Sequence, residues 1–155
     1  MNLFSDNHQE IISHLLQFEV DFIIIGGYSV IFHGYARTTG DVDIWLKPSN
    51  ENKEKFLLVL KALDFFEEDV QGIANLDFTT TLVFAIGEDP EKVEFLTQIS
   101  LVNFEEANQR KIIAEIDELA IPFLHLDDLI RSKINTGRLK DKADIEELQK
   151  IQNSK

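Results

Sequence analysis

Residues 22–46 have the sequence FIIIGGYSVIFHGYARTTGDVDIWL, from which most of the predicted fold follows. One apolar run ends at Gly26-Gly27, and a second apolar run contains Asp41 and Asp43. We predict a strand for each run and a short helix over residues 28–34 between them. Side chains alternate faces along a strand, so the carboxylates of Asp41 and Asp43 point to the same side. The stretch therefore predicts a glycine turn beside a pair of carboxylates.

Such a pair of carboxylates favours metal and phosphate chemistry. Two neighbouring carboxylates repel each other, and without a cation between them one tends to hold its proton. Hard divalent cations prefer oxygen ligands, and glycines and a helix start let the backbone approach a phosphate closely. We therefore predict phosphoryl or nucleotidyl transfer, with Asp41 and Asp43 as metal ligands and with Gly26 and Gly27 against a triphosphate. Ser29 either donates its hydroxyl to the same phosphates or only caps the short helix.

A third carboxylate is expected on a neighbouring strand. Two Mg²⁺ ions about 4 Å apart, or Mn²⁺ in their place, would clamp the attacking and leaving oxygens of an in-line displacement. Glu94 stands alone among the apolar residues of 93–97 and is the candidate for this third ligand. The alternative is a solvent-facing acid on an edge strand. Arg37 is expected either on a phosphate or on a carboxylate, and Lys133 either on the nucleotide or in solvent.

Composition limits the class of protein. The 155 residues, 44% of them hydrophobic, predict one globular domain over 1–155. The absence of cysteine excludes disulfides, thiolate zinc sites and cysteine nucleophiles. The 28 acidic residues outnumber the 15 basic ones, and this net charge of −13 disfavours long nucleic acid as a partner. No apolar run reaches the roughly 18 residues that span a bilayer, so we expect a cytoplasmic protein without a membrane partner.

The remaining sequence predicts an α+β fold, in which helices pack on a mixed sheet and two helices close the chain. Expected strands cover 21–25, 39–46, 78–86, 92–97, 112–116 and 120–124. Expected helices cover 6–18, 28–34, 51–63, 104–110 and 127–137, with a last one from Asp141. The expected helix N-caps are Ser5 or Asp6, Ser49 and Asp127.

The chain resembles the nucleotidyltransferase superfamily of DNA polymerase beta type. The shared signature is a hydrophobic strand, Gly-Gly, a short helix, Asp-x-Asp and a later third acid. The chain is most similar to small bacterial nucleotidyltransferase-like proteins related to AbiEii toxins and to minimal nucleotidyltransferases. This similarity covers about residues 10 to 150, and it is most evident over residues 34–45 and in the tail over 128–144.

The resemblance implies an enzyme that moves an NMP from an NTP such as ATP to a hydroxyl acceptor, with release of pyrophosphate. It places Gly26, Gly27 and Ser29 on the triphosphate and both metals on Asp41 and Asp43. Glu94 would be the third acid, which in this superfamily also serves as the base.

The resemblance leaves the acceptor open among a protein, a tRNA end and a small molecule. A homodimer that shares an acceptor site is compatible with it. The alternative function is a catalytically weak or inactive binding module, such as a toxin–antitoxin component that binds a protein partner.

Overall fold

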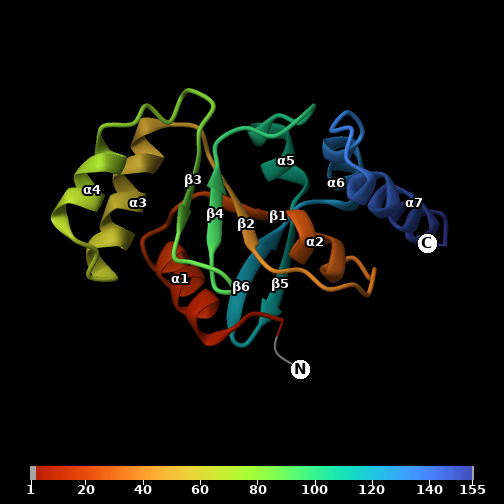
Figure 1. Cartoon of the computed structure of the whole chain (residues 1–155), viewed down its shortest axis with the longest axis horizontal. Helices are drawn as coiled ribbons and strands as arrows, with labels where there is room; N and C mark the ends of the chain where they lie inside the picture. The colour runs from red at the N-terminus through yellow and green to blue at the C-terminus, as the bar shows by residue number, and fades with distance from the viewer. Residues whose placement is uncertain (1–2, 155) are drawn as a thin grey trace.

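The computed structural model describes residues 3–154, which form a six-stranded sheet with helices on both faces (Figure 1). The strands are β1 (Phe22–Ile25), β2 (Val42–Leu46), β3 (Val83–Ile86), β4 (Val93–Leu96), β5 (Ile112–Ile116) and β6 (Leu119–Phe123). Within these residues the helices are α1 (Asp6–Gln17), α2 (Gly26–Phe32), α3 (Asn50–Ala62), α4 (Glu67–Ala74), α5 (Phe104–Arg110), α6 (Leu126–Lys133) and α7 (Leu139–Asn153).

The sheet is mixed, with the strand order β3-β4-β2-β1-β6-β5. Strand β2 pairs in parallel with β4, β1 pairs in parallel with β6, and the other neighbours are antiparallel. The predicted α+β fold class is therefore confirmed. The first two strands lie at the centre of the sheet, which places the glycine turn and Asp43 in the middle of the molecule.

Alternating side chains divide the core into two clusters, one on each face of the sheet. Phe22 and Ile24 pack under α1, α3 and α4, whereas Ile23 and Ile25 pack under α2, α5, α6 and α7. This separation follows from the two-residue period of a strand that is buried on both faces. Figure 1 shows α3 and α4 at one end of the molecule and α6 and α7 at the other.

Side-chain caps determine where several helices begin. The predicted caps Ser5 and Ser49 accept the backbone N–H groups of His8 and Asn52, and so begin α1 and α3. The prediction that Asp127 caps its helix is wrong, because the Nδ1 of His125 accepts the Asp127 N–H and the helix begins at Leu126. That helix also ends earlier than expected, at Lys133, and the last helix begins at Leu139, before Asp141.

The structure also shortens two predicted strands and adds one helix. Strand β2 begins at Val42, so residues 39–41 precede it. Residues 78–82 are not strand, because the Asp77 carboxylate accepts both the N–H and the hydroxyl of Thr79 and closes a turn. Such local hydrogen bonds compete with a sheet ladder despite the β-branched threonines. Helix α4 was not predicted, and its one buried residue, Val70, gives no helical period.

The buried hydroxyl of Thr97 joins this turn to the end of β4, and removing it should destabilise the fold. It accepts the Leu82 N–H at 2.8 Å and donates to the Thr80 carbonyl at 2.6 Å. We expect Thr97→Val to lower the free energy of unfolding in urea by about 1–3 kcal/mol, because the Leu82 N–H and the Thr80 carbonyl, both in part-buried hydrogen bonds, lose their partner. The exposed Thr81 offers a matched control, Thr81→Val. Equal stability of the two variants would contradict this account.

No helix within residues 3–154 has both the length and the apolar character that crossing a membrane requires.

Candidate active site

Gly26 permits the close approach on which the site is built. It lies where β1 ends and α2 begins, and its φ of +67° belongs to the left-handed region that favours glycine. A Cβ at this position would lie 2.2 Å from the Oδ2 of Asp43. Gly27 is equally restricted, since a Cβ there would lie 2.2 Å from the Oγ1 of Thr39. Gly26 therefore leaves room for the Asp43 carboxylate against the turn, and Gly27 leaves room for the side chain of Thr39.

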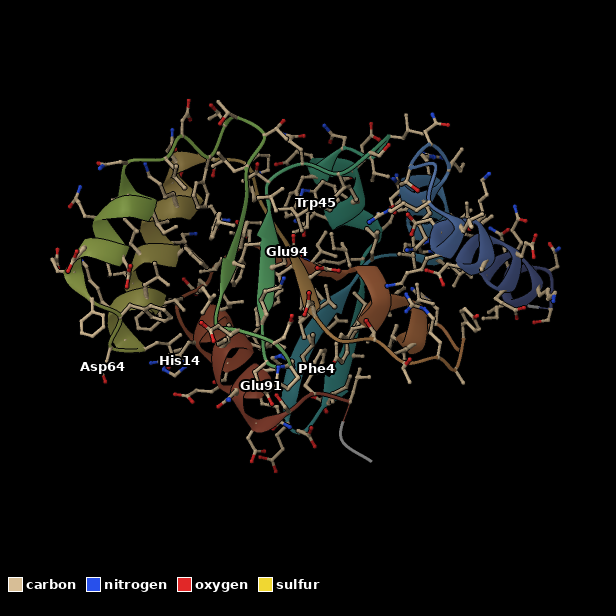
Figure 2. All side chains as sticks on the ribbon, in the orientation of Figure 1. Phe4, His14, Trp45, Asp64, Glu91 and Glu94 are labelled. Atoms are coloured by element: carbon tan, nitrogen blue, oxygen red, sulfur yellow. The ribbon has the colours of Figure 1, made fainter. Side chains whose placement is uncertain are left out.

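Asp43 and Glu94 lie side by side on neighbouring strands. They are directly paired in the parallel register of β2 and β4. Burial, followed by the nearby charges of Glu94 and Asp41, raises the pKa of Asp43 to about 7, against the opposing effect of Lys133. Figure 2 shows Glu94 near the centre of the molecule. The pair is thus two acids in partly buried surroundings, one of which holds a proton near neutral pH.

Asp41 lies one position before β2 and is held by a cation. Its Oδ2 is 3.3 Å from the Nζ of Lys92, the residue two positions before Glu94 on the neighbouring strand. Within residues 3–154, no group of three or more His, Asp or Glu side chains already converges as a cation cage. In this arrangement Asp41 is paired with Lys92, whereas Asp43 and Glu94 are paired with each other in the register of the two strands.

Two cavities meet at the acidic pair, since both are lined by Asp43, Glu94 and Arg138. The first, of about 310 Å³, lies between Gly26, the chain at 96–100 and the C-terminal residues Ser132, Lys133 and Thr136. The second, of about 550 Å³, is lined by Gly27, Thr39, Asp41, Asp89 and Lys140, among others. The site therefore consists of two adjoining cavities that share Asp43, Glu94 and Arg138 in their walls.

Lys133 brings positive charge to the first cavity although it is buried. Its Nζ lies 3.0 Å from the Oδ1 of Asp141 and 3.2 Å from the Oδ2 of Asp144. Burial opposes ionisation of Asp141, but hydrogen bonds from Thr136 and Lys133 hold the pKa of its carboxyl below the ordinary value. The lysine is therefore fixed in one direction and is not a solvated helix residue.

The structure places Arg37 and Ser29 behind the glycine turn. The Nε of Arg37 lies 3.0 Å from the Oδ1 of Asp144, and a Cβ on Gly27 would lie 3.2 Å from its Nη2. Ser29 is completely buried in α2 and is not among the described residues that line either cavity. The structure thus brings together the two glycines, the three acids and Lys133, while Arg37 and Ser29 form a second layer.

Sequence reasoning missed several residues of the site. Lys92 was not singled out, although its position two residues before Glu94 places it on the same side of β4. Arg138 was not among the predicted site residues, yet it lines both cavities. The wall at 96–100 follows β4 and carries no motif. The sequence could have indicated this wall in one way only. The segment that follows the third acid must leave the sheet next to the site.

Solved structures with a similar fold define the class of fold. TM1012 from Thermotoga maritima is 21% identical, has a TM-score of 0.61, and matches over 96% of this chain and 91% of its own. The lincomycin-bound lincosamide antibiotic adenylyltransferase LnuA is 15% identical, with a TM-score of 0.56 over 97% of this chain and 99% of its own. The antibiotic-resistance factor ANT(2'')-Ia is 12% identical, with a TM-score of 0.55 over 96% of this chain and 82% of its own. At these identities the likeness shows the fold alone.

The fold, together with the acids at its glycine turn, is that of a nucleotidyltransferase. The family model for "Nucleotidyltransferase of unknown function (DUF6036)" matches residues 1–154, and the chain belongs to this family. The predicted superfamily and the predicted enzyme class are thereby confirmed. No curated protein matches the sequence.

Proposed function

We propose that this protein transfers an NMP from an NTP, with ATP as the first donor to test, to a hydroxyl group of an acceptor and releases pyrophosphate. The observation that carries the proposal is the pairing of Asp43 with Glu94 on neighbouring strands, together with the close approach of Asp43 to Gly26. It places two carboxylates, a backbone turn open to phosphate and the cation of Lys133 around one cavity. We further propose that residues 1–155 act as one domain in the cytoplasm.

The donor set fits Mg²⁺, with Mn²⁺ as a substitute. Its ligands are all carboxylate oxygens, and the unneutralised pair of Asp43 and Glu94 has the charge that a divalent cation compensates. Asp41 would complete the set after leaving Lys92. When bound, the metal ions, two in this proposal, act as Lewis acids that stabilise the charge on the phosphates.

The protein's own groups position the NTP and receive a proton. The backbone at Gly26 lies against the triphosphate in the cavity that Lys133 also lines, and Gly27 borders the second cavity. Ser29, which is buried within α2, supports the turn from behind, and the guanidinium of Arg37 lies beside Gly27. A carboxylate oxygen of Glu94 accepts the proton of the acceptor hydroxyl as its oxygen attacks the α-phosphorus.

A small molecule is the acceptor that the cavities favour over a tRNA end or a protein side chain. Their volumes, about 310 and 550 Å³, fall in the range of small-ligand sites. The net charge of −13 works against a tRNA. LnuA, whose fold this chain shares, is an adenylyltransferase of lincosamide antibiotics, which also supports an acceptor of this size.

The experiment that tests the proposal follows two labels from ATP in a cell extract. Label at the α-phosphate should appear on an acceptor, and label at the γ-phosphate should appear only in pyrophosphate. Label from the γ-phosphate on the acceptor would instead indicate a kinase and contradict the proposal. ATP binding without any label transfer would favour the non-catalytic module, such as a toxin–antitoxin component.

Cation binding at the site should depend on pH. The cation requires ionised Asp43, whose pKa of about 7 means that binding below neutral pH must displace a proton. We expect millimolar Mg²⁺ to raise the thermal unfolding midpoint more at about pH 8 than at about pH 6. Calorimetry in two buffers of different ionisation enthalpy should show proton release at the lower pH. An equal effect of Mg²⁺ at both pH values would contradict the raised pKa.

A further inference from the structure

A buried ionic network connects the last two helices with the glycine turn. Asp144 on α7 is 1% exposed, and its two oxygens contact both Arg37 and Lys133. Asp141, one helical turn earlier, is 3% exposed and contacts Lys133 through Oδ1. Its Oδ2 accepts from the hydroxyl of Thr136 at 2.6 Å and from the Nε of Arg138 at 2.7 Å. Every oxygen of the two carboxylates therefore has a partner.

The charges of the network do not cancel. Three cations, Arg37, Lys133 and Arg138, share two carboxylates, which leaves one positive charge in excess in a chain of net charge −13. The excess lies at the cavity, because Lys133 and Arg138 line it together with Asp43 and Glu94. Because Asp43 and Glu94 line the same cavity, an anionic group beside Lys133 and Arg138 would take up this excess once a cation offsets the acidic pair.

The network also fixes the direction of side chains that are flexible by themselves. A lysine has a long stem and a point charge, and holding its amine in one place costs side-chain entropy. Contacts to Asp141 and Asp144 hold the amine in place before any substrate arrives. Asp144 does the same for Arg37, whose Nη2 lies beside Gly27.

We propose that Asp141 and Asp144 are positioning residues, which hold the amine of Lys133 and the guanidinium of Arg37 at the glycine turn for the phosphates of the incoming NTP. The inference rests on the proposed function and adds to it the residues that organise the phosphate side of the site. It also gives the C-terminal helices a role, since α7 supplies both carboxylates.

Equilibrium binding of Mg-ATP to the full-length protein tests this inference. We expect Asp144→Asn to raise the Kd for ATP at least about tenfold, because the amine and the guanidinium lose their shared anchor. The matched control is Asp128→Asn on α6. Asp128 is also 1% exposed and forms an ion pair with Arg110 at 2.8 Å, but it is not among the described residues that line the cavities. Its Kd for ATP should stay within about twofold of the wild-type value.

A double-mutant cycle separates positioning from general stability. If Asp144 acts through Lys133 and Arg37, Asp144→Asn should raise the Kd for ATP less in the Lys133→Met background than in the wild type, because only the contribution of Arg37 is then left to lose. If Asp144→Asn does not fold, Asp141→Asn takes its place in the experiment, and we expect the same rise of at least about tenfold in its Kd for ATP.

The outcomes distinguish this inference from the proposed function. Wild-type affinity in Asp144→Asn, or equal weakening in Asp128→Asn, overturns the inference while the proposed function stands. A wild-type protein that binds no NTP overturns both.

Discussion

Asp43→Asn should abolish nucleotidyl transfer while leaving the protein folded. The substitution keeps the shape of the side chain but removes the charge that a divalent cation requires beside Glu94. Loss of several kcal/mol of transition-state stabilisation corresponds to a rate about a thousandfold lower. The measurement is the rate of pyrophosphate release with the acceptor found by label transfer. Asp128→Asn, which changes a buried carboxylate elsewhere, should retain most of the activity.

The same substitution should stabilise the metal-free protein above neutral pH. The pKa of Asp43 is about 7 in the folded protein against an ordinary value of 3.8, so the folded state binds this proton more tightly than the unfolded state. The stabilisation that this bound proton gives the folded state is fully present below about pH 4, and it is lost as pH rises through about 7. Asparagine does not ionise, so the variant avoids the cost of a buried charge beside Glu94. Urea unfolding at about pH 8 should therefore show that its free energy of unfolding is higher by about 2–4 kcal/mol. A loss of stability at that pH would contradict the account of a repelled, buried carboxylate.

Gly26→Ala should have the second large effect. An alanine at φ +67° is strained by about 1–2 kcal/mol, and its Cβ would lie 2.2 Å from the Oδ2 of Asp43. The Asp43 carboxylate must move, so we expect transfer activity to fall on the order of a hundredfold. Steady-state kinetics and the urea midpoint measure the two consequences separately.

Gly87→Ala is the matched control for backbone strain. Gly87 has a φ of +79°, and a Cβ there would approach only backbone atoms, at 3.7 Å or more. Both variants should lose the stability that the backbone strain costs, Gly26→Ala should also lose whatever the displacement of Asp43 costs, and Gly87→Ala should keep its activity. Equal activities would mean that the turn does not position Asp43.

The central part of the fold follows directly from local sequence. The apolar runs, the glycines and the alternation of Asp41 and Asp43 predict two strands, a turn and a shared face, because each depends on neighbours within a few residues. The third acid was also within reach, since Glu94 is the only acid within its apolar segment, 93–97. The roles of these acids stay predictions, whereas their proximity is a feature of the structure.

The contacts that organise the site depend on long-range packing and were not predictable. Lys92 lies beside Asp41 only because β4 pairs with β2 in one particular register. Asp144 contacts Arg37 across 107 positions of the chain. The first part of the strand predicted over 78–86 was wrong for the opposite reason. A short-range turn at Asp77 outweighs the β-branched composition of residues 78–82.

Calorimetric titration of the wild-type protein with ATP, with and without Mg²⁺, tests the central claim most directly. The account predicts binding that requires Mg²⁺, is lost in Asp43→Asn and is retained in Asp128→Asn. Failure of the wild-type protein to bind any NTP in the presence of Mg²⁺, or binding that is unchanged in Asp43→Asn, would contradict it.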